Sequence, residues 1–124
     1  MALEVGAGSG GTASSVLPVV ESACERYVFT DVSEAFLRHA RVRFGRFAFV
    51  EYALLNIDSD PRLQGFAVRS FELLIAVNVL HATPNMHNSL RHCRLLLRPA
   101  GILLVNEAVA VSYTHLTLPT ICSV

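Results

Sequence analysis

Residues 3–12, with the sequence LEVGAGSGGT, constrain the fold of this chain more than any other stretch. An apolar segment leads directly into a loop that has four glycines between residues 6 and 11. Glycine lets the backbone turn sharply and approach a ligand closely, because it has no side chain. A helical pattern follows, and the first turn of a helix offers free N–H groups and the positive end of the helix dipole. A strand, a glycine loop and a helix in this order are typical of a nucleotide-binding α/β unit.

The apolar periodicity of residues 1–110 predicts one alternating α/β domain. It indicates strands over residues 1–5, 27–30, 47–55, 71–77 and 102–106. Helices are predicted over residues 12–22 and 34–44, and from a Thr83 cap along the stripe Met86, Leu90, Cys93 and Leu97. Strands that alternate with helices favour a doubly wound, Rossmann-like parallel sheet, here with about five strands and flanking helices.

Polar residues stand where the predicted strands end, in an otherwise apolar sheet. Because the carboxyl ends of parallel strands lie at one edge, these residues are expected to converge on a ligand site at the switch point of the sheet. They are Glu4, Asp31, Asn56, Asp58, Asn78, His81 and Glu107.

The glycine loop fits two templates that differ in their ligand. The spacing GxGxxG from Gly6, with Asp31 about 20 residues further on, matches the dinucleotide fingerprint. The spacing ExGxGxG from Glu4 matches the loop of S-adenosylmethionine-dependent methyltransferases. A carboxylate two residues before the loop would repel a pyrophosphate, but it suits a ligand with an ammonium and a sulfonium group. Glu4 therefore favours S-adenosylmethionine.

The similarity to a known family extends beyond the loop, through YVFTDVS at residues 27–33, DP with QGF in residues 60–66, AVNVLHAT at residues 76–83, and LLLRP at residues 95–99. With these motifs the chain resembles the C-methyltransferase domain of iterative polyketide synthases, especially the fungal highly reducing kind. The resemblance implies the class I methyltransferase fold and S-adenosylmethionine as the methyl donor.

The resemblance also implies cofactor-binding roles. The backbone of Gly6, Gly8 and Gly10 would approach the cofactor, and Asp31 would bind the ribose hydroxyls. Asn56 stands where relatives usually have an adenine-binding Asp, and its carbonyl would accept from the adenine amino group more weakly than a carboxylate. Two interpretations of Asn78 stay open: it lines the cofactor site, or it only ends the strand over residues 71–77.

His81 and Glu107 fit the position of a His–Glu pair that the family uses in catalysis. Methylation of carbon needs an enolate, formed when a base removes the proton between a ketone and a thioester, and His titrates near neutral pH. Glu107 would hydrogen-bond the imidazole and stabilise its protonated form. The structural alternatives are that His81 only caps the next helix and that Glu107 only faces solvent.

We therefore expect a methyltransferase that methylates the α-carbon of a β-ketoacyl intermediate, carried by an acyl carrier protein, alongside other synthase domains in the same chain. The alternatives are a free-standing small-molecule O- or N-methyltransferase and an inactive binding or structural domain. The net charge of zero and the lack of an apolar run of about 20 residues argue against nucleic acid and membranes as partners. Cys24, Cys93 and Cys122 lie far apart, which indicates reduced thiols in the cytoplasm and no metal site.

The two ends of the chain suggest a fragment. The sequence starts on a core strand, so we expect residues 1–110 to be part of a longer methyltransferase domain. Residues 111–124 resemble the translation of a transposon-type sequencing adapter, and the alternative is a genuine strand-rich extension. We assign no role to His115 or Cys122, and we expect His39, His87 and His92 to lie exposed on helices.

Overall fold

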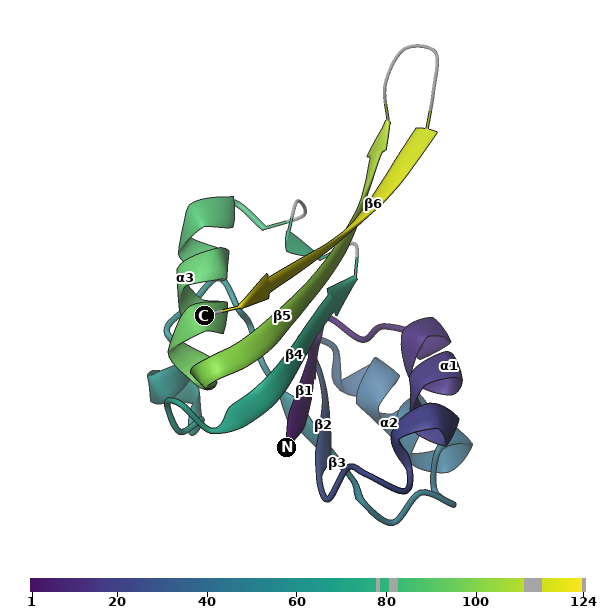
Figure 1. The fold of residues 1–124 in the computed structure, drawn as a ribbon. Helices are drawn as coiled ribbons and strands as arrows, with labels where there is room; N and C mark the ends of the chain where they lie inside the picture. The colour runs from purple at the N-terminus through teal and green to yellow at the C-terminus, as the bar shows by residue number, and fades with distance from the viewer. Residues whose placement is uncertain (78, 81–82, 111–114, 124) are drawn as a thin grey trace.

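The computed structural model describes residues 1–77, 79–80, 83–110 and 115–123, with side chains described as far as Asn106. It is one twisted sheet with helices on both faces (Figure 1). The elements, in chain order, are β1 (Ala2–Val5), α1 (Gly11–Val20), β2 (Tyr27–Asp31), α2 (Glu34–Arg43), β3 (Val50–Leu54), η1 (Pro61–Gln64), β4 (Phe71–Val77), α3 (Met86–Leu96), β5 (Leu97–Ala110) and β6 (His115–Ser123).

The strand order is β3-β2-β1-β4-β5-β6, and β1 to β5 are parallel. The predicted five-stranded, doubly wound parallel sheet is therefore confirmed. The chain winds outward from β1 to β3 and then crosses back to place β4 on the other side of β1. The glycine loop after β1 and the segment after β4 consequently meet at the switch point, at the carboxyl edge of the sheet.

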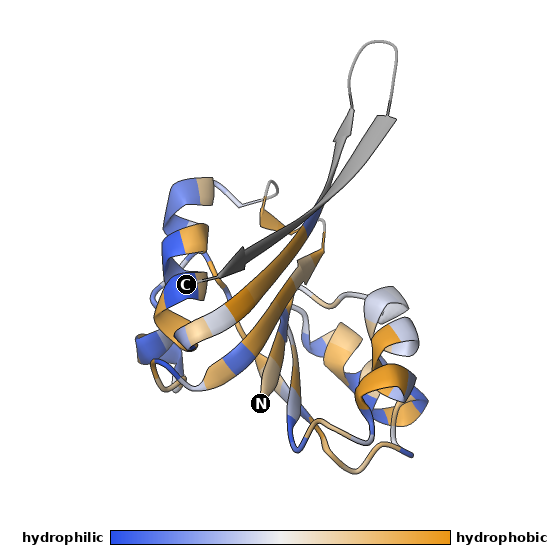
Figure 2. Ribbon diagram, in the orientation of Figure 1, coloured by the Kyte–Doolittle hydropathy of each residue, from blue (hydrophilic) through white to orange (hydrophobic). Residues whose placement is uncertain are grey.

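The two faces of the sheet have separate apolar cores because side chains alternate along each strand. Tyr27 and Phe29 pack under α1 and α2, together with Leu17 and Leu37. Val28 lies on the opposite face, in the cluster that also contains side chains of α3. Figure 2 shows the hydrophobic residues along the central strands and hydrophilic residues over η1 and much of α3.

Helix α3 begins and packs differently from the sequence prediction. Its cap is Asn85, whose side chain accepts a hydrogen bond from the Asn88 N–H at 3.0 Å. The Thr83 hydroxyl instead donates to the Leu80 carbonyl at 2.7 Å. The buried side chains of α3 are Ser89, His92, Cys93 and Leu96. Of the predicted stripe, Cys93 and Leu97 are buried, Leu90 is partly buried and Met86 is exposed.

His92 is consequently buried, with 7% of its surface exposed, and its expected surface position was wrong. Its Nδ1 lies 2.6 Å from the Ile57 carbonyl oxygen, so Nδ1 carries the proton and donates. The prediction failed because it treated His as polar surface. A buried imidazole is stable when a backbone acceptor satisfies it.

β6 runs antiparallel to β5, from the pair Ile102–Ser123 to the pair Ala110–His115. β5 itself extends from Leu97 to Ala110, beyond the predicted residues 102–106, and with β6 it continues past the end of β4 as a two-stranded ribbon (Figure 1). An alternating apolar sequence can pair with any open sheet edge. The adapter origin of residues 111–124 therefore stays a prediction.

Candidate functional site

The glycine loop leaves β1 in a conformation that residues with side chains rarely adopt. Gly6, Gly8 and Gly10 have φ angles of +62°, +58° and +91°. Gly10 lies directly before α1 and serves as its N-cap without a capping side chain. The loop therefore carries backbone groups rather than side chains at the start of the helix, at the switch point of the sheet.

Two neighbouring segments occupy the inner side of this loop. A Cβ on Gly6 would lie 2.1 Å from the Val79 Cγ2, and a Cβ on Gly10 would lie 2.7 Å from the Phe44 ring. The same construction on Gly8 meets only the Gly6 carbonyl oxygen, at 4.0 Å. The loop is thus packed from behind at Gly6 and Gly10, and it has room for a ligand beside Gly8.

The Asp31 carboxylate fixes the loop to the end of β2. Its Oδ2 accepts a hydrogen bond from the Gly8 N–H at 2.8 Å, and its Oδ1 accepts one from the Ser33 N–H at 3.0 Å. The Ala7 N–H also donates to the Thr30 carbonyl at 2.8 Å. Only 6% of the Asp31 surface is exposed. A carboxylate has about four acceptor positions, so Asp31 retains capacity for a ligand hydroxyl while it holds the loop.

Helix α2 supplies a second brace, which the sequence reasoning missed. The Arg43 Nη1 donates to the Ser9 carbonyl at 2.7 Å. The Arg43 guanidinium also lies over the Phe44 ring, 5.1 Å from its centroid. The brace depends on where the last turn of α2 comes to lie, and no local pattern signals it.

Glu4 is a buried carboxyl at the end of β1, one residue before the last residue of the strand. Only 2% of its surface is exposed, and its Oε1 accepts a hydrogen bond from the Tyr27 hydroxyl at 2.6 Å. Burial raises the pKa of Glu4 to about 7. The Tyr27 hydrogen bond opposes this rise, and the nearby Asp31 charge adds to it. Near neutral pH this carboxyl therefore changes its charge easily. Its direct contact with a ligand ammonium stays a prediction.

Asn56 is exposed two residues after the end of β3, at the same edge of the sheet. Its Oδ1 accepts a hydrogen bond from the Asp58 N–H at 3.1 Å. The Gln64 side chain bonds both backbone groups of Asn56, at 2.8 Å to the N–H and 2.9 Å to the carbonyl. The Leu55 N–H donates to the Asp31 carbonyl at 3.0 Å, so the segment that Gln64 holds lies beside the end of β2.

Val32 is an apolar residue at this edge that the sequence reasoning did not single out. It directly follows Asp31, yet 69% of its surface is exposed. An exposed apolar side chain beside Asp31 and close to the clamped Asn56 segment suits a flat, apolar ligand group.

Asn78 and His81 lie outside the described residues, and so does the side chain of Glu107. The backbone still places their neighbours. Val77 at the end of β4 pairs with Asn106 in β5, and Val79 packs against Gly6. The Asn106 Oδ1 is buried and has no hydrogen-bond partner among the described residues. Within the same part of the chain, no group of three or more His, Cys, Asp or Glu side chains is placed to hold a metal ion.

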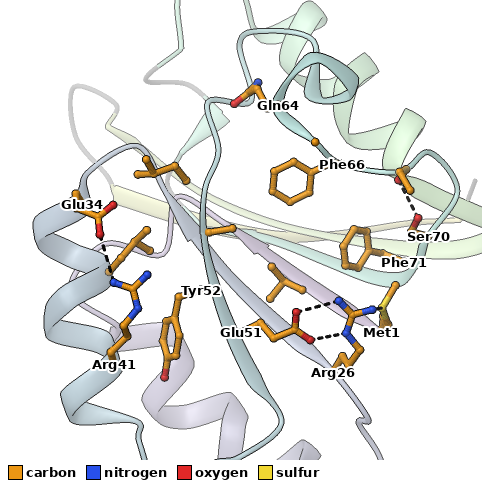
Figure 3. A pocket seen from close by; sticks show the side chains of 16 residues that line it. Met1, Arg26, Glu34, Arg41, Glu51, Tyr52, Gln64, Phe66, Ser70 and Phe71 are labelled. Atoms are coloured by element: carbon orange, nitrogen blue, oxygen red, sulfur yellow. Dashed lines mark hydrogen bonds and ion pairs between the residues drawn. The ribbon is translucent and has the colours of Figure 1, made fainter.

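A hollow that borders the glycine loop and a larger one at the edge of the sheet are the two considered for the ligand. A hollow of about 410 Å³ between α1 and the strands β4 and β5 is lined by Gly11, Thr12, Val77 and Asn106, among others. A larger one of about 650 Å³ surrounds the edge strand β3 (Figure 3). Its rim holds a salt bridge between Arg26 and Glu51. Because no residue of the glycine loop lines the larger hollow, we do not assign the ligand to it.

Known proteins are similar to this chain in sequence and in fold. A family model described as a methyltransferase domain matches residues 3–103. Polyketide synthase ThaG of Burkholderia thailandensis is 50% identical over 120 residues. Squalestatin hexaketide synthase of a Phoma species is 45% identical over 118 residues. These alignments cover 93% and 91% of this chain, but only 2% and 5% of the two relatives.

Solved structures of methyltransferases superpose on the fold of this chain. The CurJ carbon methyltransferase superposes with a TM-score of 0.86 at 42% identity, over 90% of this chain and 30% of the other. The trans-methyltransferase CalH, in complex with SAH, gives 0.82 at 41% identity, over 87% and 32%. The methyltransferase domain of the citrinin polyketide synthase gives 0.79 at 37% identity, over 89% and 29%. The chain thus spans about a third of these three solved chains.

Proposed function

We propose that this chain, which belongs to the methyltransferase domain family, forms the cofactor-binding part of a domain that methylates carbon during polyketide biosynthesis. The observation that carries the proposal is the glycine loop tied to the Asp31 carboxylate at the switch point of the sheet. Matched relatives are polyketide synthases, and similar solved structures include carbon methyltransferases.

S-adenosylmethionine fits the residues at this edge. Backbone groups around Gly8 have open space beside them, and Asp31 has free acceptor positions for a ribose diol. Val32 and Asn56 would face the adenine ring and its amino group. Glu4 would supply negative charge below a cationic ligand and lose its proton more readily when that ligand is present. When bound, the cofactor supplies an electrophilic methyl group on a sulfonium.

His81 and Glu107 are proposed to generate the nucleophile. His81 follows β4 and Glu107 lies in β5, and these two strands pair at Val77 and Asn106. His81 would remove the α-proton of a β-ketoacyl chain and hold it on the imidazole, and Glu107 would stabilise the resulting charge. Alignment of the enolate carbon with the methyl group is the remaining requirement for an in-line displacement.

The acceptor and its surroundings belong to the same proposal. We infer a β-ketoacyl thioester on an acyl carrier protein, within a chain that carries further synthase domains, working in the cytoplasm. The multidomain relatives support the further domains. Among the described residues, no helix is long and apolar enough to cross a membrane.

Calorimetric titration with S-adenosylhomocysteine, followed by a methylation assay on a β-ketoacyl thioester, tests the function. The binding experiment and the assay both use the synthase that we propose contains this chain. We expect His81→Ala to lower turnover by about 10²- to 10⁴-fold and to leave binding nearly unchanged. His87→Ala, an exposed position on α3, is the control. Unchanged turnover in His81→Ala would rule out the base, and lack of binding by the synthase would rule out the cofactor assignment.

A further inference from the structure

A basic groove lies at the edge of the sheet opposite the glycine loop. It has a volume of about 560 Å³ and is formed by η1, the segment before β4, the carboxyl half of α3 and the start of β5. The chain contains no lysine, and five of its ten basic residues line this groove. They are Arg62, Arg69, Arg91, Arg94 and Arg98.

Most of this charge is not neutralised within the groove. Arg62 pairs with Asp60 at 2.7 Å, and Arg98 pairs with Glu72 at 2.7 Å. Among the described residues, no salt bridge engages the other three guanidinium groups, and Arg91 donates a hydrogen bond to the Asn88 Oδ1. A chain with zero net charge thus concentrates positive charge on one surface.

The groove also has an apolar side. Val68 is 44% exposed, and Leu95 and Pro99 line the same hollow. Arg69, next to Val68, has a φ of +53°, and its N–H donates to the Leu95 carbonyl at 2.9 Å. A left-handed conformation of a residue with a side chain costs free energy and persists only where its surroundings impose it. The hydrogen bond from the Arg69 N–H to the Leu95 carbonyl imposes this conformation. It holds Val68 and Arg69 beside α3, which forms one side of the groove.

The arginines and the apolar side chains of the groove together indicate which class of partner fits it. Arginine beside small apolar surface is enriched at protein interfaces, where lysine is depleted. No aromatic residue lines the groove, so it lacks the stacking platform that single-stranded nucleic acid uses. We propose that the groove docks an acidic amphipathic helix of a partner protein domain, with its carboxylates on the arginines and its leucines on Val68 and Leu95. The proposal is independent of methyl transfer, since the groove lies away from the glycine loop.

The test uses three probes with this chain. One is a helical peptide with leucine on one face and glutamate on the other, the second is polyglutamate of equal charge, and the third is a single-stranded oligonucleotide. Fluorescence anisotropy gives the dissociation constants. NMR shift changes in the amphipathic peptide titration are expected at Val68 and Leu95. Arg94→Glu is expected to weaken binding of the amphipathic peptide about tenfold.

Arg38→Glu is the matched control, because it makes the same charge change at an exposed position of another helix, α2. It is expected to bind the amphipathic peptide like the unsubstituted chain. The proposal is overturned if the amphipathic peptide does not bind, or if polyglutamate or the oligonucleotide binds as tightly. Equal losses in the two variants would also overturn it. Circular dichroism melting confirms that both variants remain folded.

Discussion

The Asp31 carboxylate and the backbone of Gly8 are joined by a hydrogen bond of 2.8 Å between Oδ2 and N. This bond links the end of β2 to the loop after β1, across 23 residues of sequence. The residue proposed to bind the cofactor ribose therefore also shapes the loop on which the cofactor would rest. Binding and loop geometry are consequently expected to respond together when Asp31 is changed.

Replacement of Asp31 is expected to lower both stability and ligand binding. Asp31→Ala removes the acceptors of the Gly8 and Ser33 N–H groups, which should cost about 1–3 kcal/mol for each group left unsatisfied. Asp31→Asn retains one acceptor oxygen and should cost less. Urea unfolding and calorimetric titration with S-adenosylhomocysteine measure the two effects. Glu34→Gln, at an exposed carboxylate on α2, is the control. An unchanged unfolding midpoint in Asp31→Ala would show that this bond does not hold the loop.

The effect of an alanine substitution in the glycine loop on stability is expected to depend on its position. Gly6→Ala combines a positive φ with a methyl group 2.1 Å from Val79, so it should destabilise strongly. Gly11→Ala meets nothing within 4 Å at the start of α1. It should be neutral or stabilising by up to about 1 kcal/mol. Thermal melts of the two variants compare them directly. If the clash matters, Val79→Ala should recover part of the loss in a double-mutant cycle. Equal melting temperatures for Gly6→Ala and Gly11→Ala would contradict the packing described here.

The buried Glu4 carboxyl should make the free energy of unfolding depend on pH between 4.5 and about 7. Its pKa is raised from 4.5 to about 7, chiefly by burial. Between these values the folded chain holds a proton that the unfolded chain has lost. The free energy of unfolding should therefore fall as pH rises from 4.5 to 7, by up to about 1.4 kcal/mol per pH unit.

Urea titrations at several pH values measure this slope, and Glu4→Gln should remove it. Tyr27→Phe deletes the hydrogen bond that lowers the pKa of Glu4, so the window should extend to higher pH. Glu72 and Asp60, whose pKa values are lowered to about 2 by ion pairs and hydrogen bonds, titrate below this window. A slope that persists in Glu4→Gln would assign the pH dependence to another group.

His92 is expected to be a structural residue. His92→Ala leaves the Ile57 carbonyl without its donor and opens a space in the core, which should cost about 1–3 kcal/mol. His92→Asn places an amide donor near the position of Nδ1 and should recover part of the loss. His87→Ala, exposed on the same helix, should have no effect. Chemical unfolding measures all three variants, and unchanged stability of His92→Ala would contradict the structural role.

The sequence alone determined the sheet and its polar edge. Apolar runs separated by helical patterns predict parallel strands, because strands buried on both faces are apolar throughout. Glycines after the first strand and Asp31 after the second marked the edge, since parallel strands place their carboxyl ends together. The family resemblance then identified the ligand class. These features are local or repeat with a fixed period, so a linear sequence displays them.

Only the tertiary structure decided which groups hold the site together. The Glu4 side chain is buried and bonded to Tyr27, because its direction follows the alternation of β1 over the α1 and α2 face. Arg43 reaches the Ser9 carbonyl from 34 residues away, and His92 reaches Ile57 from 35. Such contacts depend on how helices settle on a sheet. That packing is set by the whole core at once, and no periodicity along the chain records it.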